Sequence, residues 1–384
     1  MKKLAVIFAL ISVLAVFLPA SLFADENLLT ELVDEQGNAI EWEQIEEYFE
    51  DLKSDFKSGG SAFDIFKQIL SGEQTVGGGS FLKYLFETFF RRLAAVLPML
   101  LTIVVVALLC GVLTKSKSTL FGKSTSEIVF FVCYAVIIVS VITSVWSYVN
   151  STKETLTKIK TLTNIAMPVL LAFISAAGAK VGLAVYQPSV ALLSNGIIEI
   201  ACGLVMPLII VTFVFSVVSN LSDNIKLDKI ANFFRNFAVS VFGIAFTVFS
   251  AFLTVQGINA NVFDSISIRA AKFATKNYIP ILGGYLADGM DLILASSVLV
   301  KNAFGAVALL LLALTIAVPI VEMLVFSLLL QLTAGIIEPV TDERIVKFLS
   351  SVAKNITLLI VVLLGVAFML FIVILLIIST ANVF

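Results

Sequence analysis

Asp264–Lys301, with the sequence DSISIRAAKFATKNYIPILGGYLADGMDLILASSVLVK, determines how the rest of the chain is interpreted. The segment begins as a basic amphipathic stretch and then meets Pro280 and the pair Gly283–Gly284. It continues as an apolar run that contains Asp288 and Asp291. A carboxylate within a membrane segment costs roughly 2.5–3.5 kcal/mol on insertion scales, so it normally faces protein or water. This stretch is therefore the first candidate for a polar function.

The composition of the chain excludes a soluble globular protein. Of its 384 residues, 59% are hydrophobic and only 14% are charged, and the mean hydropathy is +1.06. Soluble domains contain about 25% charged residues. Several apolar runs exceed about 20 residues, the length that crosses a hydrocarbon core of about 30 Å. The composition therefore predicts an all-α, polytopic integral membrane protein.

The charge and the missing residue types exclude several functions. A net charge of −2 gives no support for nucleic-acid binding. Because the chain contains no histidine, catalytic triads and metal sites built on histidine are excluded. We predict no enzymatic activity, no cofactor and no metal site.

The N-terminus has the layout of a secretory signal segment, which we place at residues 1–24. Lys2 and Lys3 precede an apolar run from Leu4 to Leu18, and small residues follow as far as Ala24. This order predicts export of the following segment, with cleavage after Ala24. An uncleaved anchor is the alternative.

Residues 25–80 form an acidic region with fourteen Asp or Glu against three Lys in residues 25–79. Trp42, Ile45, Phe49 and Leu52 follow the 3–4 spacing of one helix face, and a second short helix is expected around Phe66. About 55 residues bury only a small core. We therefore expect a small extracytoplasmic helical region that serves as a docking element or cap and not as an independent enzyme domain.

Residues 81–150 predict a transmembrane hairpin. Leu93–Leu113 and Ile128–Val149 are both long enough to cross the membrane, and the loop between them contains Lys115, Lys117 and Lys123. Three lysines in a short loop favour the cytoplasmic side. This placement agrees with an exported N-terminus.

The remainder of the chain predicts an internal duplication, with residues 151–257 and 258–384 as the two copies. Pro168 and Pro207 are 39 residues apart, as are Pro280 and Pro319. We predict about eight transmembrane helices. The alternative is six, with the segments at Pro168 and Pro280 re-entrant or broken. Three crossings per copy would invert the second copy, whereas two would leave the copies parallel.

Short hydrophobic segments interrupted by glycine or proline at corresponding positions of two copies indicate a transport site. Because such interruptions free backbone groups, these segments normally face protein or a water-filled cavity. The alternative is that they lie near the interface and serve assembly only. The candidate lining residues of a transport pathway are Pro168, Gly178, Lys180, Glu199, Pro280, Gly283, Gly284, Asp288, Asp291 and Glu322.

Ile266–Gly284, ISIRAAKFATKNYIPILGG, with the motifs ADGMD and SSVLVKNAFGA following it, resembles the stage III sporulation protein AE family of endospore-forming bacteria. The pattern R-x-A-K-x-A-x-x-N-x-x-P is more specific than a hydrophobic coincidence. The resemblance also extends to the layout of signal segment, acidic exported region and many spans. The departures concentrate in the acidic region, which puts partner contacts there in doubt.

The resemblance implies a multi-pass component of the mother-cell membrane around the forespore. Members of the family belong to a secretion-like channel complex that links mother cell and forespore and is needed for late forespore development. The implied partners are other stage III sporulation membrane proteins, including a secretion-type ATPase and ring-forming subunits, together with membrane lipid. The resemblance is also compatible with a homo-oligomer of this chain. A permease-like subunit, a structural scaffold and a stand-alone solute transporter are the competing functions.

Overall fold

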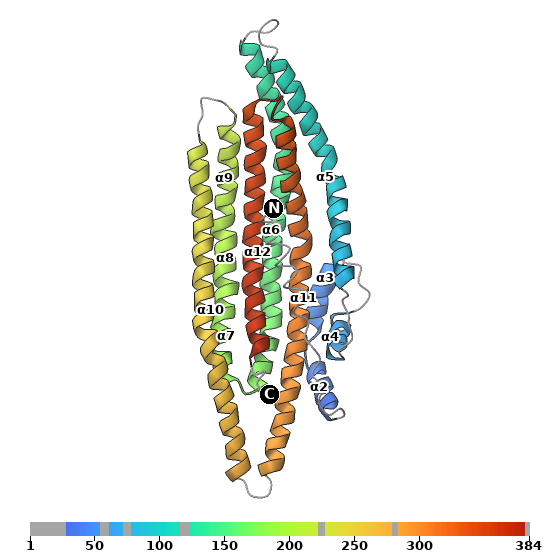
Figure 1. Ribbon diagram of the computed structural model, residues 1–384, viewed down its shortest axis with the longest axis vertical. Coiled ribbons are helices and arrows are strands. Elements are labelled where there is room, and N and C mark those ends of the chain that lie inside the picture. The colour runs from blue at the N-terminus through green and yellow to red at the C-terminus, as the bar shows by residue number, and fades with distance from the viewer. Residues whose placement is uncertain are drawn as a thin grey trace.

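The computed structural model describes residues 28–53, 61–71, 78–115, 123–221, 227–278 and 283–380. Every regular element in these ranges is a helix, and most of the helices run along the long axis of the molecule (Figure 1). The all-α membrane fold is therefore confirmed. The predicted signal segment lies outside the described residues.

Three short helices, α2 (Leu28–Asn38), α3 (Glu43–Lys53) and α4 (Ala62–Leu70), form the N-terminal region. The helix α3 buries Ile45, Phe49 and Leu52, as the 3–4 spacing predicted. Trp42 packs edge-on or tilted against Phe63 and Phe66 of α4 and against Phe304 of α11. Because its apolar residues are covered by the long helices, the region docks onto the bundle, as expected for so small a core.

Six helical columns in the described residues are long and apolar enough to span a membrane. Their elements are α5 (Gly78–Lys115), α6 (Lys123–Ala176), the continuous column of α7 (Lys180–Ala191), η1 (Leu192–Ile197), α8 (Ile198–Ile200), η2 (Ala201–Val205) and α9 (Met206–Ser219), then α10 (Asp228–Tyr278), α11 (Gly283–Ile337) and α12 (Glu343–Ser379). Six equals the alternative count, while the exact number of crossings stays a prediction. The segment at Pro168 continues α6, and the segment after Pro280 begins α11, so neither crosses by itself.

The longest helices exceed the thickness of a membrane. At 1.5 Å per residue, the 55 residues of α11 extend over about 80 Å, against a hydrocarbon core of about 30 Å. A large part of α6, α10 and α11 must therefore lie outside the hydrocarbon. The predicted copy boundaries at residues 150 and 257 fall inside α6 and α10.

The two proposed copies run in the same direction. The column from α7 to α9 points the same way as α11, and α10 points the same way as α12 (Figure 1). This is the direction that the parallel alternative predicts. The internal duplication itself stays a prediction.

The helices α11 and α12 form the centre of the bundle. In the most hydrophobic stretch of α11, 72% of the residues are buried, and in that of α12, 61%. In the most hydrophobic stretch of α5, only 28% of the residues are buried. Residues such as Phe326, Phe348 and Met369 are fully buried. The central position of α11 brings its polar residues into contact with α3, α5 and α6.

Candidate functional site

A polar cavity of about 150 Å³ lies where α3, α5, α6 and α11 meet. Charged, hydroxyl-bearing and apolar side chains share its surface. The lining residues are Leu52, Tyr84, Arg92, Ser151, Glu154, Thr155, Lys158, Leu314, Thr315, Val318, Pro319 and Glu322. Three of the four contributing helices belong to membrane-spanning columns, so polar groups gather here against an apolar background.

An ion pair between Arg92 of α5 and Glu322 of α11 borders the cavity. The Glu322 side chain is 15% exposed and the Arg92 side chain is 42% exposed. A partly buried carboxylate requires a cation or hydrogen bonds to offset its lost hydration. The guanidinium of Arg92 supplies this compensation and joins the outer helix α5 to the central helix α11.

Pro319 adds a backbone acceptor to the same wall. Proline has no N–H, so it cannot donate the helical hydrogen bond to the carbonyl of Thr315 one turn earlier. Both Thr315 and Pro319 line the cavity. An interrupted backbone of this kind is tolerated at membrane depth only against protein or water. The sequence predicts such an interruption at Pro168 and Pro280, and not at Pro319.

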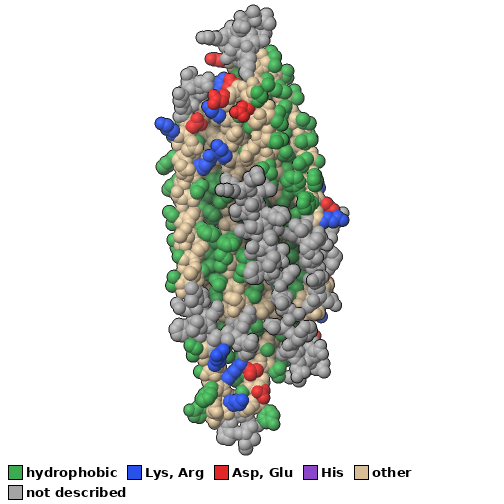
Figure 2. Space-filling view, in the orientation of Figure 1, with side chains coloured by type: hydrophobic (Ala, Val, Ile, Leu, Met, Phe, Trp, Pro, Cys, Tyr) green, Lys and Arg blue, Asp and Glu red, His purple; other side chains and the backbone are tan. Residues whose placement is uncertain are grey.

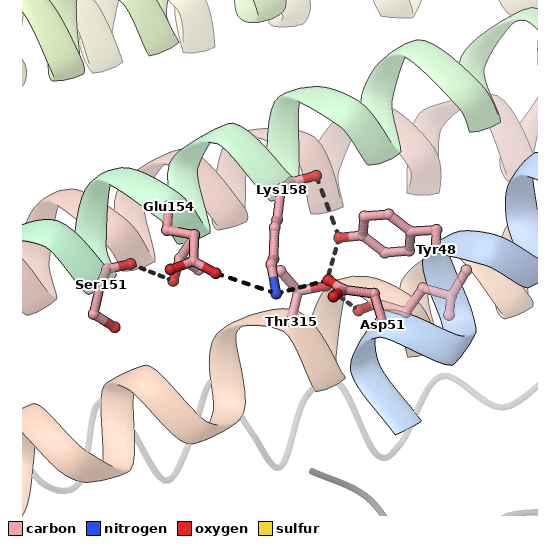
Figure 3. A network of polar contacts seen from close by, with 8 residues as sticks. Tyr48, Asp51, Ser151, Glu154, Lys158 and Thr315 are labelled. Atoms are coloured by element: carbon pink, nitrogen blue, oxygen red, sulfur yellow. Dashed lines mark hydrogen bonds and ion pairs between the residues drawn. The ribbon is translucent and has the colours of Figure 1, made fainter. Parts of the chain in front are cut away.

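Lys158 of α6, which also lines the cavity, is the centre of a polar network (Figure 3). Its Nζ lies 2.8 Å from Asp51 Oδ2 of α3 and 3.5 Å from Glu154 Oε1 one turn earlier on α6. Lys158 is partly buried, whereas both carboxylates are mostly exposed. The network ties the N-terminal region to the rim of the cavity.

Tyr48, one turn before Asp51 on α3, extends the network toward α11. Its hydroxyl lies 2.7 Å from Thr315 Oγ1 and donates to the carbonyl of Lys158 at 3.2 Å (Figure 3). Burial raises the pKa of the Tyr48 phenol above its usual range, so the hydroxyl remains protonated. The helix α3 therefore contacts both α6 and α11 through one side chain.

The structure places the predicted pathway residues in separate locations. Of those that the structure describes, only Glu322 borders the cavity. Glu199, which lies between two π-helical segments, pairs with Lys160 at 2.6 Å, and Asp291 pairs with Lys272. The remaining predicted residues are distributed as follows: Pro168 is exposed within α6, Gly178 forms the α6–α7 turn, Lys180 and Asp288 are exposed, Gly283 and Gly284 begin α11, and Pro280 lies outside the described residues.

Gly178 has a clear structural role. Its φ of +75° lies in the left-handed region, which only glycine adopts at no steric cost. The tight connection between α6 and α7 depends on it. A pathway role for the predicted residues away from the cavity stays a prediction.

Sequence reasoning missed Tyr48, Asp51, Lys158 and Thr315. Their contacts join α3 to α6 and α11, and no local spacing in the sequence reports such a meeting. One signal was present: Glu322, a carboxylate within an apolar run, was a candidate lining residue of a pathway.

We expect the double variant Y48F/D51N to loosen α3 from the bundle. The tyrosine hydrogen bonds contribute about 1 kcal/mol and the exposed ion pair about 0.2–1 kcal/mol, so the total is modest. Hydrogen exchange of residues 43–53 in the purified protein should become faster by roughly tenfold. The control E47Q removes an exposed carboxylate of the same helix and should leave exchange unchanged. Equal exchange in Y48F/D51N and the unaltered protein would contradict a docking role.

Comparisons with known proteins agree with the motif in Ile266–Gly284. The family model described as stage III sporulation protein AE matches residues 61–381. The chain is 26% identical over 356 residues to stage III sporulation protein AE of Bacillus subtilis (strain 168), covering 92% of this chain and 89% of the relative. No solved structure matches. With a family match over most of its length, the chain belongs to the stage III sporulation protein AE family.

Proposed function

We propose that the chain is a permease-like membrane subunit of a sporulation complex and that polar solutes pass it through the cavity between α5, α6 and α11. The carrying observation is that the cavity combines Arg92, Glu322, Lys158 and the freed carbonyl of Thr315 within membrane-spanning columns. Arg92 and Lys158 lie beyond the ends of the apolar runs Leu93–Leu113 and Ile128–Val149, so the cavity lies where a polar pathway through these spans would open. Family membership supports the sporulation role.

The cavity suggests how a passage would be controlled. In the described residues α3 contributes Leu52 to its lining and holds Lys158 through Asp51. The N-terminal region therefore covers one side of the cavity, and its displacement would open that side. We propose that partner subunits of the complex, including an ATPase and ring-forming proteins of the kind that the family resemblance implies, supply the energy and the conduit beyond the mother-cell membrane.

A structural scaffold that conducts nothing is the second candidate. The observation that favours it is the pairing of the cavity's charges: Arg92 with Glu322, and Lys158 with Asp51 and Glu154. Such pairs join helices regardless of whether solutes pass. The two functions differ in whether the space inside the cavity matters.

Filling the cavity distinguishes the two functions. We expect S151F and T155F, each of which places a ring where Ser151 or Thr155 now borders the cavity, to abolish heat-resistant spores with little loss of protein from the membrane. The matched control is T143F on the same helix, because Thr143 is exposed and does not belong to the cavity lining. The measurement is spore yield in a host whose own copy has been deleted, alongside the amount of protein in the membrane.

The outcomes of this experiment are distinct. Few spores with normal protein levels for both cavity variants, and normal spores for T143F, support passage through the cavity. Normal spores from S151F and T155F at normal protein levels would show that the space is dispensable, and the scaffold would be the remaining function.

A further inference from the structure

The lower end of the bundle is a helical hairpin that extends beyond the hydrophobic core. The core reaches Ile268 on α10 and Leu294 on α11, and none of the described residues between these two positions belongs to it. We call residues 268–278 of α10 and 284–294 of α11 the tip hairpin. It extends past the ends of α6, α7 and α12 (Figure 1).

The tip hairpin exposes large aromatic side chains. Phe273 is 67% exposed, Tyr278 is 81% exposed and Tyr285 is 78% exposed. Leu286 and Ile293 are also exposed. Large apolar residues that gather on one exposed element mark an interaction site, and tyrosine is suited to a boundary that is apolar on one side and wet on the other.

Basic residues accompany these rings. Arg269, Lys272 and Lys276 on α10 face two acidic residues, Asp288 and Asp291 on α11, so the tip hairpin has a net charge of +1 in a chain of net −2. Lys272 pairs with Asp291, while Arg269 and Lys276 are exposed. Figure 2 shows charged side chains at this lower tip, next to hydrophobic ones. Long basic side chains can place their charge among lipid head groups while neighbouring rings enter the acyl boundary.

The length of α11 places the tip hairpin away from the membrane that the protein spans. The upper end of the bundle carries the charged turn from Asp342 to Arg344. From Ile337, just before that turn, to Gly284, the helix covers 53 steps of 1.5 Å, or about 80 Å. On α6, the apolar run Ile128–Val149 is followed by the charged residues Lys153, Glu154, Lys158 and Lys160. A hydrocarbon core of about 30 Å therefore ends above them, and tens of ångströms remain between its lower face and the tip.

From these observations we infer that the tip hairpin binds the surface of a second, anionic lipid bilayer, with Phe273, Tyr278 and Tyr285 inserted and Arg269 and Lys276 among the head groups. The protein would thus contact two bilayers at opposite ends of its long helices. A lipid surface fits better than a second copy of the chain, because the exposed charges and rings lie around the end of a narrow hairpin, where they match a planar acidic surface and not a complementary face. This inference is independent of passage through the cavity.

A vesicle-binding experiment tests the inference. The full chain is reconstituted in phosphatidylcholine nanodiscs and mixed with vesicles of phosphatidylcholine alone or with added phosphatidylglycerol, and co-flotation is measured. We expect flotation with the phosphatidylglycerol vesicles that weakens as salt is raised. F273S/Y278S/Y285S should lower the bound fraction at least tenfold, and R269Q/K276Q roughly tenfold.

The matched control is D288N, which removes an exposed acidic residue from the same hairpin and should leave flotation equal or stronger. Size-exclusion elution of every variant verifies that the bundle remains folded. Absence of flotation, equal flotation with neutral vesicles, unchanged flotation of both multiple variants, or weaker flotation of D288N would overturn the inference. Association of nanodiscs with one another in place of vesicle binding would also overturn it, because it would identify a second copy as the partner.

Discussion

Alanine at Gly111 will destabilise the bundle by on the order of 3 kcal/mol. A Cβ on Gly111 of α5 would lie 2.9 Å from the carbonyl carbon of Val340 and 3.0 Å from Cα of Thr341. Both atoms belong to the backbone of the turn between α11 and α12, so they cannot move as a side chain does. Overpacking of this kind costs about 1–3 kcal/mol. If the added methyl group pushes α5 away from the turn, it also strains the hydrogen bond that Thr341 Oγ1 donates to the carbonyl of Ala107 at 2.9 Å. Such a bond contributes about 1 kcal/mol.

The matched control for Gly111 is Gly335 near the end of α11, where nothing lies within 4 Å of an added Cβ. G335A should be neutral or stabilise the protein by about 0.5–1 kcal/mol through helix propensity. The measurement is thermal unfolding of the detergent-solubilised protein, followed by the fraction that remains monodisperse. Equal midpoints for G111A and G335A would show that the α5 contact with the turn is not tightly packed.

Reversing one member of the Arg92–Glu322 pair will destabilise the protein by about 2 kcal/mol, and reversing both will restore most of the loss. E322R places two guanidinium groups in contact, and R92E places two carboxylates there. Breaking a fully buried pair costs about 3–5 kcal/mol and an exposed pair about 0.2–1 kcal/mol. With side chains 42% and 15% exposed, this pair lies between the two cases.

The test is a cycle of R92E, E322R and R92E/E322R, measured by thermal unfolding and by the amount of protein in the membrane. A doubly reversed protein that is no more stable than the single variants would contradict a direct pairing. The pair E343Q and K347Q serves as the control, because Glu343 and Lys347 form an exposed ion pair on α12 at 2.8 Å. Each should change stability by less than about 1 kcal/mol.

The membrane class and the helices followed from local sequence. Hydropathy and run length depend only on neighbouring residues, so they predicted apolar spans without knowledge of packing. The spacing of Ile45, Phe49 and Leu52 likewise predicted the buried face of α3, because helical geometry relates positions three and four apart. Glu322 was found because a carboxylate in an apolar run is costly wherever the run packs.

The continuity of the longest helices required the tertiary structure. Apolar length alone cannot distinguish one helix of 54 residues from two shorter spans joined at Pro168. Packing determines whether the helix continues through the proline, because neighbouring helices compensate for the hydrogen bond that an internal proline cannot make. The internal duplication and the exact number of crossings stay predictions.

The site also required the tertiary structure. Asp51 and Lys158 meet only because α3 folds back onto α6, and Thr315 joins them only because α11 lies at the centre of the bundle. The sequence by itself determined the kind of protein, the residues that would be costly to bury and the positions of its prolines, since these are local properties. Only the packing of helices far apart in the chain decided which charges pair and where a polar cavity remains.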